Sequence, residues 1–156
     1  MSSNPTRPPE EETTSPSEHP LVQRVRNESY GIGRLLGMEA GPMGGGTAIL
    51  ELQTGPQHAN PMGTVHGGVL CDLADAAMGM AFMTTLDQDQ TFTTLELKIN
   101  FLRPVWSSRL RAEGRVVSRG GTIGLTECNV TDENGKLVAR ASSTCMVLRG
   151  KQAAGR

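Results

Sequence analysis

One long, almost entirely apolar stretch limits the folds that this chain can adopt. From about Gly67 to Thr84 apolar residues recur with helical spacing, at Leu70, Leu73, Ala74, Ala77, Met78, Ala81 and Phe82. Positions outside that stripe are apolar too, so most of the helix surface should be buried. Asp72 and Asp75 are the two charged residues in it. The rest of a small domain must therefore wrap around this helix.

Strand patterns follow the helix. Residues 92–102 alternate, with Leu95, Leu97, Ile99 and Phe101 predicted on one face and Thr94, Glu96, Lys98 and Asn100 on the other. Further strands are expected over 109–117, 122–131 and 136–148. The last two flank Asp-Glu-Asn-Gly, which is typical of a hairpin turn.

Weaker signals precede the helix. We expect a short helix over 20–26, a glycine-interrupted strand over 30–39, a loop over 41–46 and a strand over 47–53. The glycine-rich loop lacks the G-x-G-x-x-G spacing and is followed by a strand pattern, so it does not predict a dinucleotide site. This element order indicates an α+β domain with a curved antiparallel sheet wrapped around one helix.

The length of 156 residues fits one domain, assigned to residues 20–149. Residues 1–19 are rich in Pro, Ser, Thr and Glu, a composition typical of a disordered tail. Residues 150–156 are expected to form a frayed C-terminus.

Composition excludes several function classes. The net charge of −1 and 3% aromatic content argue against nucleic-acid or anionic-membrane binding. No apolar run approaches the roughly 18 residues of a membrane span, and no signal-peptide pattern is found. Cys71, Cys128 and Cys145 have no metal-binding spacing, so packed, reduced thiols are expected. A cytoplasmic location is the default expectation.

The start of the long helix carries the chemistry. His66-Gly67-Gly68 follows a turn-forming stretch, and the first N–H groups of a helix have no intrahelical partners. Glycine allows a ligand close to those donors, so Gly67 and Gly68 are candidates for polarising a carbonyl oxygen. Asp75, held in an apolar helix, is the candidate base or nucleophile, and Asp72 is the rival carboxylate.

The spacing of these residues has a geometric consequence. Nine residues separate His66 from Asp75, which is about 13–14 Å along a helix at 1.5 Å per residue. One carbonyl carbon cannot contact both in the same chain. If both act on it, the active site lies at a two-fold interface and occurs twice per dimer.

Plainer explanations exist for each candidate. Asp75 could be a satisfied structural carboxylate, and His66 could be a helix-capping or packed histidine. A metal site built from His58, His66, Cys71 and Asp75 matches no zinc spacing. Cys71 has no histidine in reach on the helix, so packing explains it better than nucleophilic chemistry.

The sequence resembles the hotdog-fold acyl-CoA thioesterases, in particular the phenylacetate-degradation (PaaI-like) branch. The resemblance covers about residues 30–149. It rests on Asn60-Pro-Met-Gly-Thr-Val-His66-Gly67-Gly68, on Leu73-Ala74-Asp75, and on Ile99-Asn100-Phe101-Leu102-Arg103-Pro104. It implies a central helix wrapped by five or six antiparallel strands, in homodimers that pair into tetramers. The implied reaction is hydrolysis of an acyl-CoA thioester to free acid and CoA.

The resemblance also implies roles for single residues. Asp75 corresponds to the catalytic carboxylate, where a sister branch has Glu, and Gly67 to the backbone donor on the carbonyl. Asn60 and His66 match positions that orient carbonyl or water. Thr94 stands where some relatives have Ser and would position the water. Gly68 and Arg103 are expected to bind substrate, with Arg119 and Arg149 as further candidates for the CoA phosphates. No metal or redox cofactor is implied. CoA is part of the substrate.

Two other functions stay open at this point. An acyl-CoA hydratase or dehydratase would need an Asp/His pair at the β-carbon, and His66 at the helix start disfavours it. A non-catalytic acyl-CoA-binding protein would not need Asp75. The acyl group itself, whether aryl, medium-chain or branched, is left open by the sequence.

Overall fold

The computed structural model describes residues 18–27 and 30–154. Three α-helices, two 3-10 helices and six strands make up this part of the chain. The helices are α1 (Pro20–Asn27), α2 (Gly31–Leu36), α3 (Gly67–Met83), η1 (Pro56–His58) and η2 (Gly150–Gln152). The strands are β1 (Met38–Gly44), β2 (Thr47–Gln53), β3 (Thr91–Phe101), β4 (Arg109–Arg119), β5 (Ile123–Thr131) and β6 (Leu137–Leu148).

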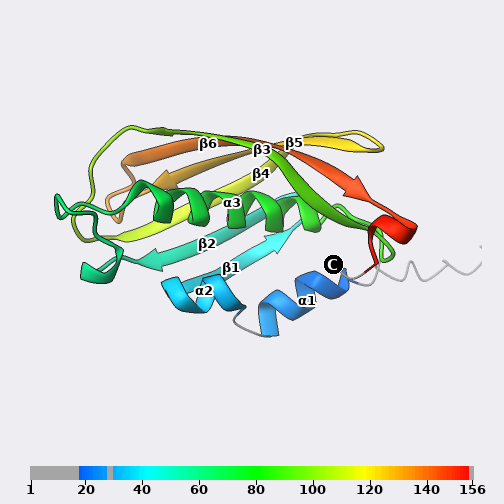
Figure 1. The fold of residues 1–156 in the computed structure, drawn as a ribbon, viewed down its shortest axis with the longest axis horizontal. Coiled ribbons are helices and arrows are strands. Elements are labelled where there is room, and N and C mark those ends of the chain that lie inside the picture. Colours follow the sequence, from blue (N-terminus) through cyan, green and yellow to red (C-terminus); the bar gives the residue numbers. More distant parts are fainter. Residues whose placement is uncertain (1–17, 28–29, 155–156) are drawn as a thin grey trace, which may run out of the picture.

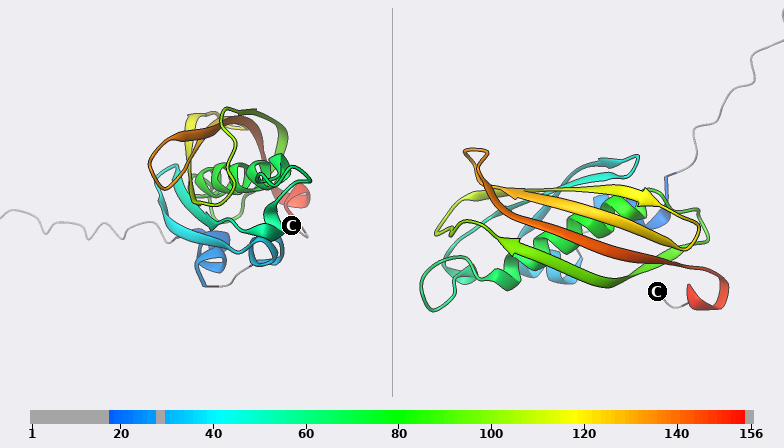
Figure 2. Two further views of the ribbon diagram at one scale, coloured as in Figure 1. Left: turned by 90° about the vertical axis from the view of Figure 1, so that its left-hand side faces the viewer. Right: turned by 90° about the horizontal axis from the view of Figure 1, so that it is seen from above.

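The six strands form one antiparallel sheet in the order β1-β2-β4-β5-β6-β3. This sheet curls around α3, which runs along its concave side (Figures 1 and 2). β1 and β3 are the two edges, and α1 and α2 lie beside β1 (Figure 1). The predicted fold, a curved antiparallel sheet around one long helix, is confirmed.

The central helix is held very close to the sheet. Nine residues of α3 are buried, among them Leu73, Ala77 and Phe82 with no exposed surface. A Cβ atom on Gly114 of β4 would lie 2.3 Å from the backbone oxygen of Ala77, so the two backbones touch where glycine stands. Asp72 and Asp75 lie on the stripe of α3 that the sheet leaves uncovered.

The first predicted strand is wrong. Residues 31–36 form α2, and the chain turns at Gly37, whose φ of 76° is a left-handed conformation suited to glycine. A contact distant in sequence secures this short helix: the Nε2 atom of buried His58 lies 2.8 Å from the backbone oxygen of Leu36. Local sequence does not contain that contact, which explains the error.

The predicted loop over 41–46 is also largely wrong. β1 continues to Gly44 and pairs with β2, and only Gly45 and Gly46 form the turn. Both have positive φ, 58° and 82°, as tight hairpin turns require. β1 is an edge strand with a register shift between Ala40 and Met43. Edge strands tolerate the glycine and proline that hide the strand pattern here.

A β-bulge changes the predicted faces of β3. Pairing with β6 shifts register between Thr94 and Glu96, so Leu95 is an extra residue in the strand. Leu95 is 53% exposed, whereas Leu97 and Ile99 pack against the core as predicted. Thr94 turns toward α3 instead of sharing a face with Glu96. Simple alternation was therefore wrong for Leu95 and Thr94.

Most of the expected N-terminal tail lies outside the described residues, but Glu18 and His19 contact the domain. Glu18 forms a 2.9 Å ion pair with Arg26, and buried His19 has its Nε2 atom 3.0 Å from the backbone oxygen of Gln90. At the other end, part of the expected frayed segment forms η2. Among the described residues no helix is long and apolar enough to span a membrane.

Candidate active site

The loop before α3 is fastened to the rest of the domain by backbone hydrogen bonds. Ala59 and Val65 form an isolated antiparallel bridge. The N–H of Val65 donates to the oxygen of Val105 at 2.7 Å, and the N–H of His66 donates to the oxygen of His58 at 2.8 Å. The first turn of α3 is therefore fixed in place.

His66 is the N-cap of α3. Its Nδ1 atom accepts a hydrogen bond from the backbone N–H of Gly68 at 2.8 Å. The N–H of Gly68 is consequently not free, contrary to the expectation that both glycines offer open donors. Within the described chain the N–H of Gly67 donates no hydrogen bond, so it is the available donor at this helix start.

Gly67 lies at the edge of a hollow of about 320 Å³. The hollow is also lined by Asn60, Phe101 and Arg103. The Asn60 amide oxygen accepts from the N–H groups of Met62 and Thr64, so this side chain shapes the loop as well as the hollow. A Cβ on Gly67 would lie 3.0 Å from the Phe101 ring, so Gly67 and Phe101 pack closely at this wall of the hollow.

Asp75 lies two turns further along α3, in a different hollow of about 230 Å³. The Thr94 hydroxyl donates a hydrogen bond to Asp75 Oδ1 at 3.3 Å, made possible by the bulge at Leu95. The remaining walls of this hollow are mostly apolar, and their residues come from α1, α3, β3 and the segment before α2. They are Val25, Tyr30, Ala76, Gly79, Met80, Met83 and Phe92.

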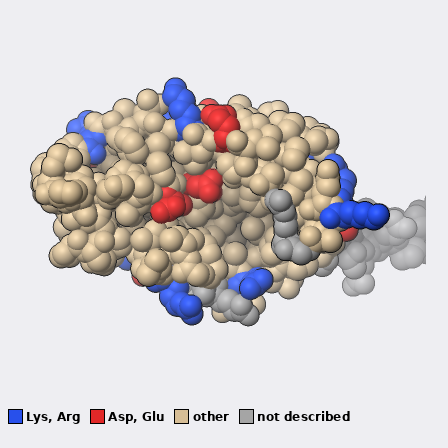
Figure 3. Space-filling view, in the orientation of Figure 1, with Lys and Arg blue, Asp and Glu red and all other residues tan. Residues whose placement is uncertain are grey.

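Three effects act on the pKa of Asp75. Burial of the carboxylate against apolar neighbours raises it most, the hydrogen bond from Thr94 lowers it, and the charge of Asp72 raises it. The net result is a pKa above the ordinary aspartate value. A raised pKa makes the carboxylate a better proton acceptor near neutral pH. The acidic side chains gathered near the middle of this face are visible in Figure 3.

The two hollows have no lining residue in common. Gly67 and Asp75 are eight residues apart on α3, which corresponds to about 12 Å along the helix axis. The structure therefore brings Asn60 and Arg103 to Gly67, and brings Thr94 to Asp75. It does not bring these two groups together within one chain.

Comparison with known protein families identifies the family to which this chain belongs. The Thioesterase superfamily model matches residues 62–139, half of the chain, and this range contains both hollows' central residues, Gly67 and Asp75. The chain belongs to the thioesterase superfamily. It is a hotdog-fold thioesterase of the PaaI-like kind.

Individual relatives agree with this assignment. A protein named as an esterase from Saccharolobus solfataricus is 36% identical over 107 residues, covering 68% of this chain and 75% of its own. The human protein named acyl-coenzyme A thioesterase 13 is 26% identical, covering 79% of this chain and 86% of its own. A solved phenylacetic acid degradation-related protein from Ralstonia eutropha is 28% identical with a TM-score of 0.73, covering 80% of this chain and 98% of its own.

Other candidate residues of this thioesterase serve its fold. Both ring nitrogens of His58 contact backbone groups, those of Gly55 and Leu36. All three cysteines are free thiols, and burial raises the pKa of Cys128 to about 12. In the part of the chain that the structure describes, no three His, Cys, Asp or Glu side chains are grouped to hold a metal ion.

Two arginines suggested for CoA binding lie elsewhere. The Arg119 guanidinium stacks on the Phe82 ring, 5.1 Å from its centre, at the C-terminal end of α3. Arg149 donates to the backbone oxygen of Gly121. Only Arg103 of the three lines the hollow at Gly67.

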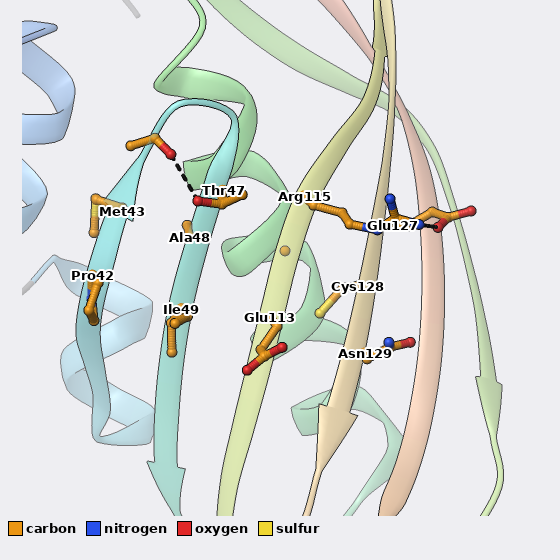
Figure 4. A pocket seen from close by; sticks show the side chains of 12 residues that line it. Pro42, Met43, Thr47, Ala48, Ile49, Glu113, Arg115, Glu127, Cys128 and Asn129 are labelled. Atoms are coloured by element: carbon orange, nitrogen blue, oxygen red, sulfur yellow. Dashed lines mark hydrogen bonds and ion pairs between the residues drawn. The ribbon is translucent and has the colours of Figure 1, made fainter.

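A hollow of about 430 Å³, larger than those at Gly67 and Asp75, lies on the face of the sheet that points away from α3 (Figure 4). Its charged side chains are already paired, with Arg115 and Glu127 2.7 Å apart and Glu113 2.7 Å from Arg111. None of the predicted site residues lines it. Selection by size alone would therefore favour the side of the sheet opposite the candidate residues.

Sequence reasoning missed the N-terminal wall of the Asp75 hollow. Val25 of α1 and Tyr30 reach it because α1 is tied down, with Val22 buried and Arg26 donating to the oxygen of Met43 at 2.6 Å. The available signal was that Tyr30 is the one tyrosine of the chain. A single tyrosine is a weak signal without the contact that places it.

Proposed function

We propose that this protein hydrolyses acyl-CoA thioesters to a free acid and CoA, at a site made by two subunits. Asp75 and Thr94 of one subunit would face Asn60, His66 and Gly67 of the other. The thioesterase family supports the reaction type. The names of two relatives, acyl-coenzyme A thioesterase 13 and 1,4-dihydroxy-2-naphthoyl-CoA hydrolase, support CoA as the thiol.

The separation of the two hollows is the observation that carries this proposal. The Asp75 hollow is lined by Phe92 and Thr94 near the start of β3, and the Gly67 hollow by Phe101 at its end. Among the described residues β3 is an edge strand, paired only with β6. An unpaired edge is a template for another strand. Antiparallel pairing of two β3 strands across a two-fold axis would bring the start of each strand beside the end of the other.

The proposed chemistry follows from the groups at each half. The N–H of Gly67, at the positive end of the α3 dipole, would stabilise negative charge developing on the thioester oxygen. Asp75 would accept the proton of an attacking water, or attack the carbonyl carbon itself. On the water route the C–S bond then breaks, the proton taken up by Asp75 passes to the sulfur, and CoA leaves as the thiol with the acyl group released as the acid. On the direct route CoA would leave first, and water would then hydrolyse the acyl-aspartyl anhydride, supplying the hydroxyl of the acid and the proton of the thiol.

The surrounding residues fit this arrangement. Thr94 would orient the water or the carboxylate, because its hydroxyl already contacts Asp75. Asn60 and His66 would position the carbonyl, and Arg103 would meet CoA phosphates at the mouth of the Gly67 hollow. We further propose a homodimer that pairs into a tetramer. The three free thiols support a reducing, cytoplasmic location.

The direct test is CoA release from a panel of aryl-, straight-chain- and branched-acyl-CoAs by wild type and Asp75→Asn. We expect turnover of at least one thioester, reduced at least about 100-fold in Asp75→Asn, since a positioned base typically contributes 10²–10⁴-fold. Undiminished turnover would remove Asp75 from the mechanism and leave Asp72 as the carboxylate to test. No turnover of any thioester by wild type would contradict the proposed function.

A further inference from the structure

The hollow at Asp75 follows one stripe along α3. The helical residues that line it recur at helical spacing and share one face of the helix: Asp75, Ala76, Gly79, Met80 and Met83. The α3 residues before Asp75 do not line it. The hollow therefore extends from Asp75 in one direction, toward the C-terminal end of α3, and Met83 is its last helical residue.

Two contacts show that β3 runs beside this stripe. The Thr94 hydroxyl donates to Asp75 Oδ1 at 3.3 Å. Two residues earlier in β3, the Phe92 ring lies against Gly79, where a Cβ would be 3.1 Å from the ring atom Cζ. The spacings agree, because four helical residues rise about 6 Å and two strand residues about 6.6 Å. The β3 side of the hollow is thus parallel to the axis of α3.

Packing keeps the Phe92 wall in place. The ring meets Phe82 edge-on, with the ring centres 5.5 Å apart, and it is partly buried against that cluster. Because glycine stands at position 79, the ring can lie directly on the helix backbone. The hollow is consequently bounded by fixed side chains along its length.

The hollow is apolar away from Asp75. Apart from Asp75 and Thr94 at one end, Tyr30 is the one lining residue with a polar side-chain atom, and its hydroxyl is itself buried. An occupant that carries a charge at its far end would lose hydration without gaining a partner there. The chemistry of the lining therefore suits a hydrocarbon tail.

The length of the stripe limits that tail. Asp75 and Met83 are eight residues apart, which is about 12 Å along the helix axis. With a C–C bond of about 1.5 Å, an extended hydrocarbon chain advances roughly 1.3 Å per carbon. The volume of about 230 Å³ is below the roughly 300–1,000 Å³ of drug-sized ligand pockets, so the hollow suits an acyl group rather than a whole CoA molecule.

We propose that Met83 is a specificity-determining residue that limits the length of the acyl chain. The carbonyl lies at Asp75, and an unbranched, apolar chain of about eight to ten carbons lies along α3 with its methyl end against Met83. The inference rests on the proposed function, since it takes the Asp75 hollow as the acyl site. It adds the direction of the chain, its class and the residue that measures it.

The first test is a chain-length series in wild type. The substrates are even-numbered straight-chain acyl-CoAs from butanoyl to hexadecanoyl, each below its micelle concentration, with benzoyl-CoA as the aryl comparison. We expect kcat/KM to rise about two- to fourfold per methylene while each added group is buried. The rise should stop at octanoyl or decanoyl, and benzoyl-CoA should be a poorer substrate than either.

Two substitutions of Met83 should move the optimum in opposite directions. Met83→Ala opens the end of the hollow and should shift the optimum about two carbons longer, whereas Met83→Trp fills it and should shift the optimum about two carbons shorter. The comparison is made across substrates within each variant. A smaller folded fraction would scale all rates alike and leave the optimum where it is.

Met78→Ala is the matched control. It makes the same truncation in the same helix, but Met78 has no exposed surface and does not line the hollow. We expect a lower thermal midpoint, because a buried side chain is lost, and an unchanged chain-length optimum.

Several outcomes would overturn the role of Met83. They are an optimum that stays the same in both Met83 variants, one that moves the same way in both, and one that moves equally in Met78→Ala. A wild type that prefers benzoyl-CoA, or whose kcat/KM rises without limit to hexadecanoyl, would overturn the proposed class of acyl group. Failure of the proposed function is distinguishable, because wild type would then release CoA from none of these substrates.

Discussion

At the scale of single residues, the proposed role of Asp75 predicts how activity depends on pH. If the ionised carboxylate of Asp75 acts in the reaction, activity falls as the pH drops through its pKa. Because burial and Asp72 raise that pKa, the acid limb of the pH–rate profile should have its midpoint above the ordinary aspartate pKa of about 3.9. The position of the limb, unlike the maximal rate, reports on the carboxylate itself.

Two substitutions should move this acid limb in opposite directions. Asp72→Asn removes a like charge and should shift the limb of kcat/KM to lower pH. Thr94→Val removes a hydrogen bond to the ionised form and should shift it to higher pH. The measurement is a pH–rate profile of each variant beside wild type. Shifts in the same direction, or none, would separate Asp75 from the titrating group.

The Gly67 donor can be removed without disturbing the helix start. Proline is favoured at the first helical position, and the ψ of 135° at His66 suits a residue that precedes proline. Gly67→Pro should therefore lower kcat about 100- to 1,000-fold through loss of the N–H alone. Gly67→Ala is the control, because it crowds the Phe101 ring similarly but keeps the donor. Equal losses in both variants would assign the effect to crowding.

At the scale of elements, the close contact between α3 and β4 positions the helix that carries both Gly67 and Asp75. A Cβ at Gly114 would meet the Ala77 oxygen at 2.3 Å, and backbone cannot yield as a side chain can. We expect Gly114→Ala to lower the free energy of unfolding by about 1–3 kcal/mol and to reduce activity by shifting α3. Gly121→Ala, with no atom within 4 Å of its Cβ, should change stability by less than about 0.5 kcal/mol in thermal denaturation. Equal stability of both variants would contradict this account of the packing.

Sequence patterns predicted the elements whose own residues show a clear helical or alternating apolar spacing. The α3 helix, the β2 strand and the hairpin of β5 and β6 follow from apolar spacing and turn residues. The α2 helix and the glycine-containing β1 strand depend on partners far away in the chain, such as His58 and β2. Local patterns cannot contain those contacts.

The candidate site was predictable to a similar extent. The motif at His66 and the carboxylate at Asp75 stand out in the sequence, and the helix rise alone separates them. The side of β3 on which Thr94 lies depends on one extra residue at Leu95, which alternation cannot reveal. Tyr30 reaches the hollow only through the packing of α1 and α2.

At the scale of the whole molecule, one chain presents two separate hollows, at Gly67 and at Asp75, and β3 is an open edge among the residues that the structure describes. The opposite face of the sheet carries charged side chains joined in cross-strand ion pairs, including Arg109 with Glu51 at 2.6 Å and Arg115 with Glu127 at 2.7 Å. The uncovered stripe of α3 instead carries Asp72 and Asp75 without a cationic partner among the described side chains. This contrast supports the α3 side as the face on which we propose that a second copy binds.

The most direct test of a site shared between subunits is to mix two inactive variants. Asp75→Asn and Gly67→Pro, unfolded together and refolded, should form mixed dimers in which one of the two sites has both wild-type residues. Random pairing makes half of the dimers mixed, so about one quarter of wild-type CoA release should return. Each variant refolded alone should stay inactive. If the mixture also stays inactive while size-exclusion chromatography and mass analysis show mixed dimers, the two residues do not act across the interface, and the central claim is wrong.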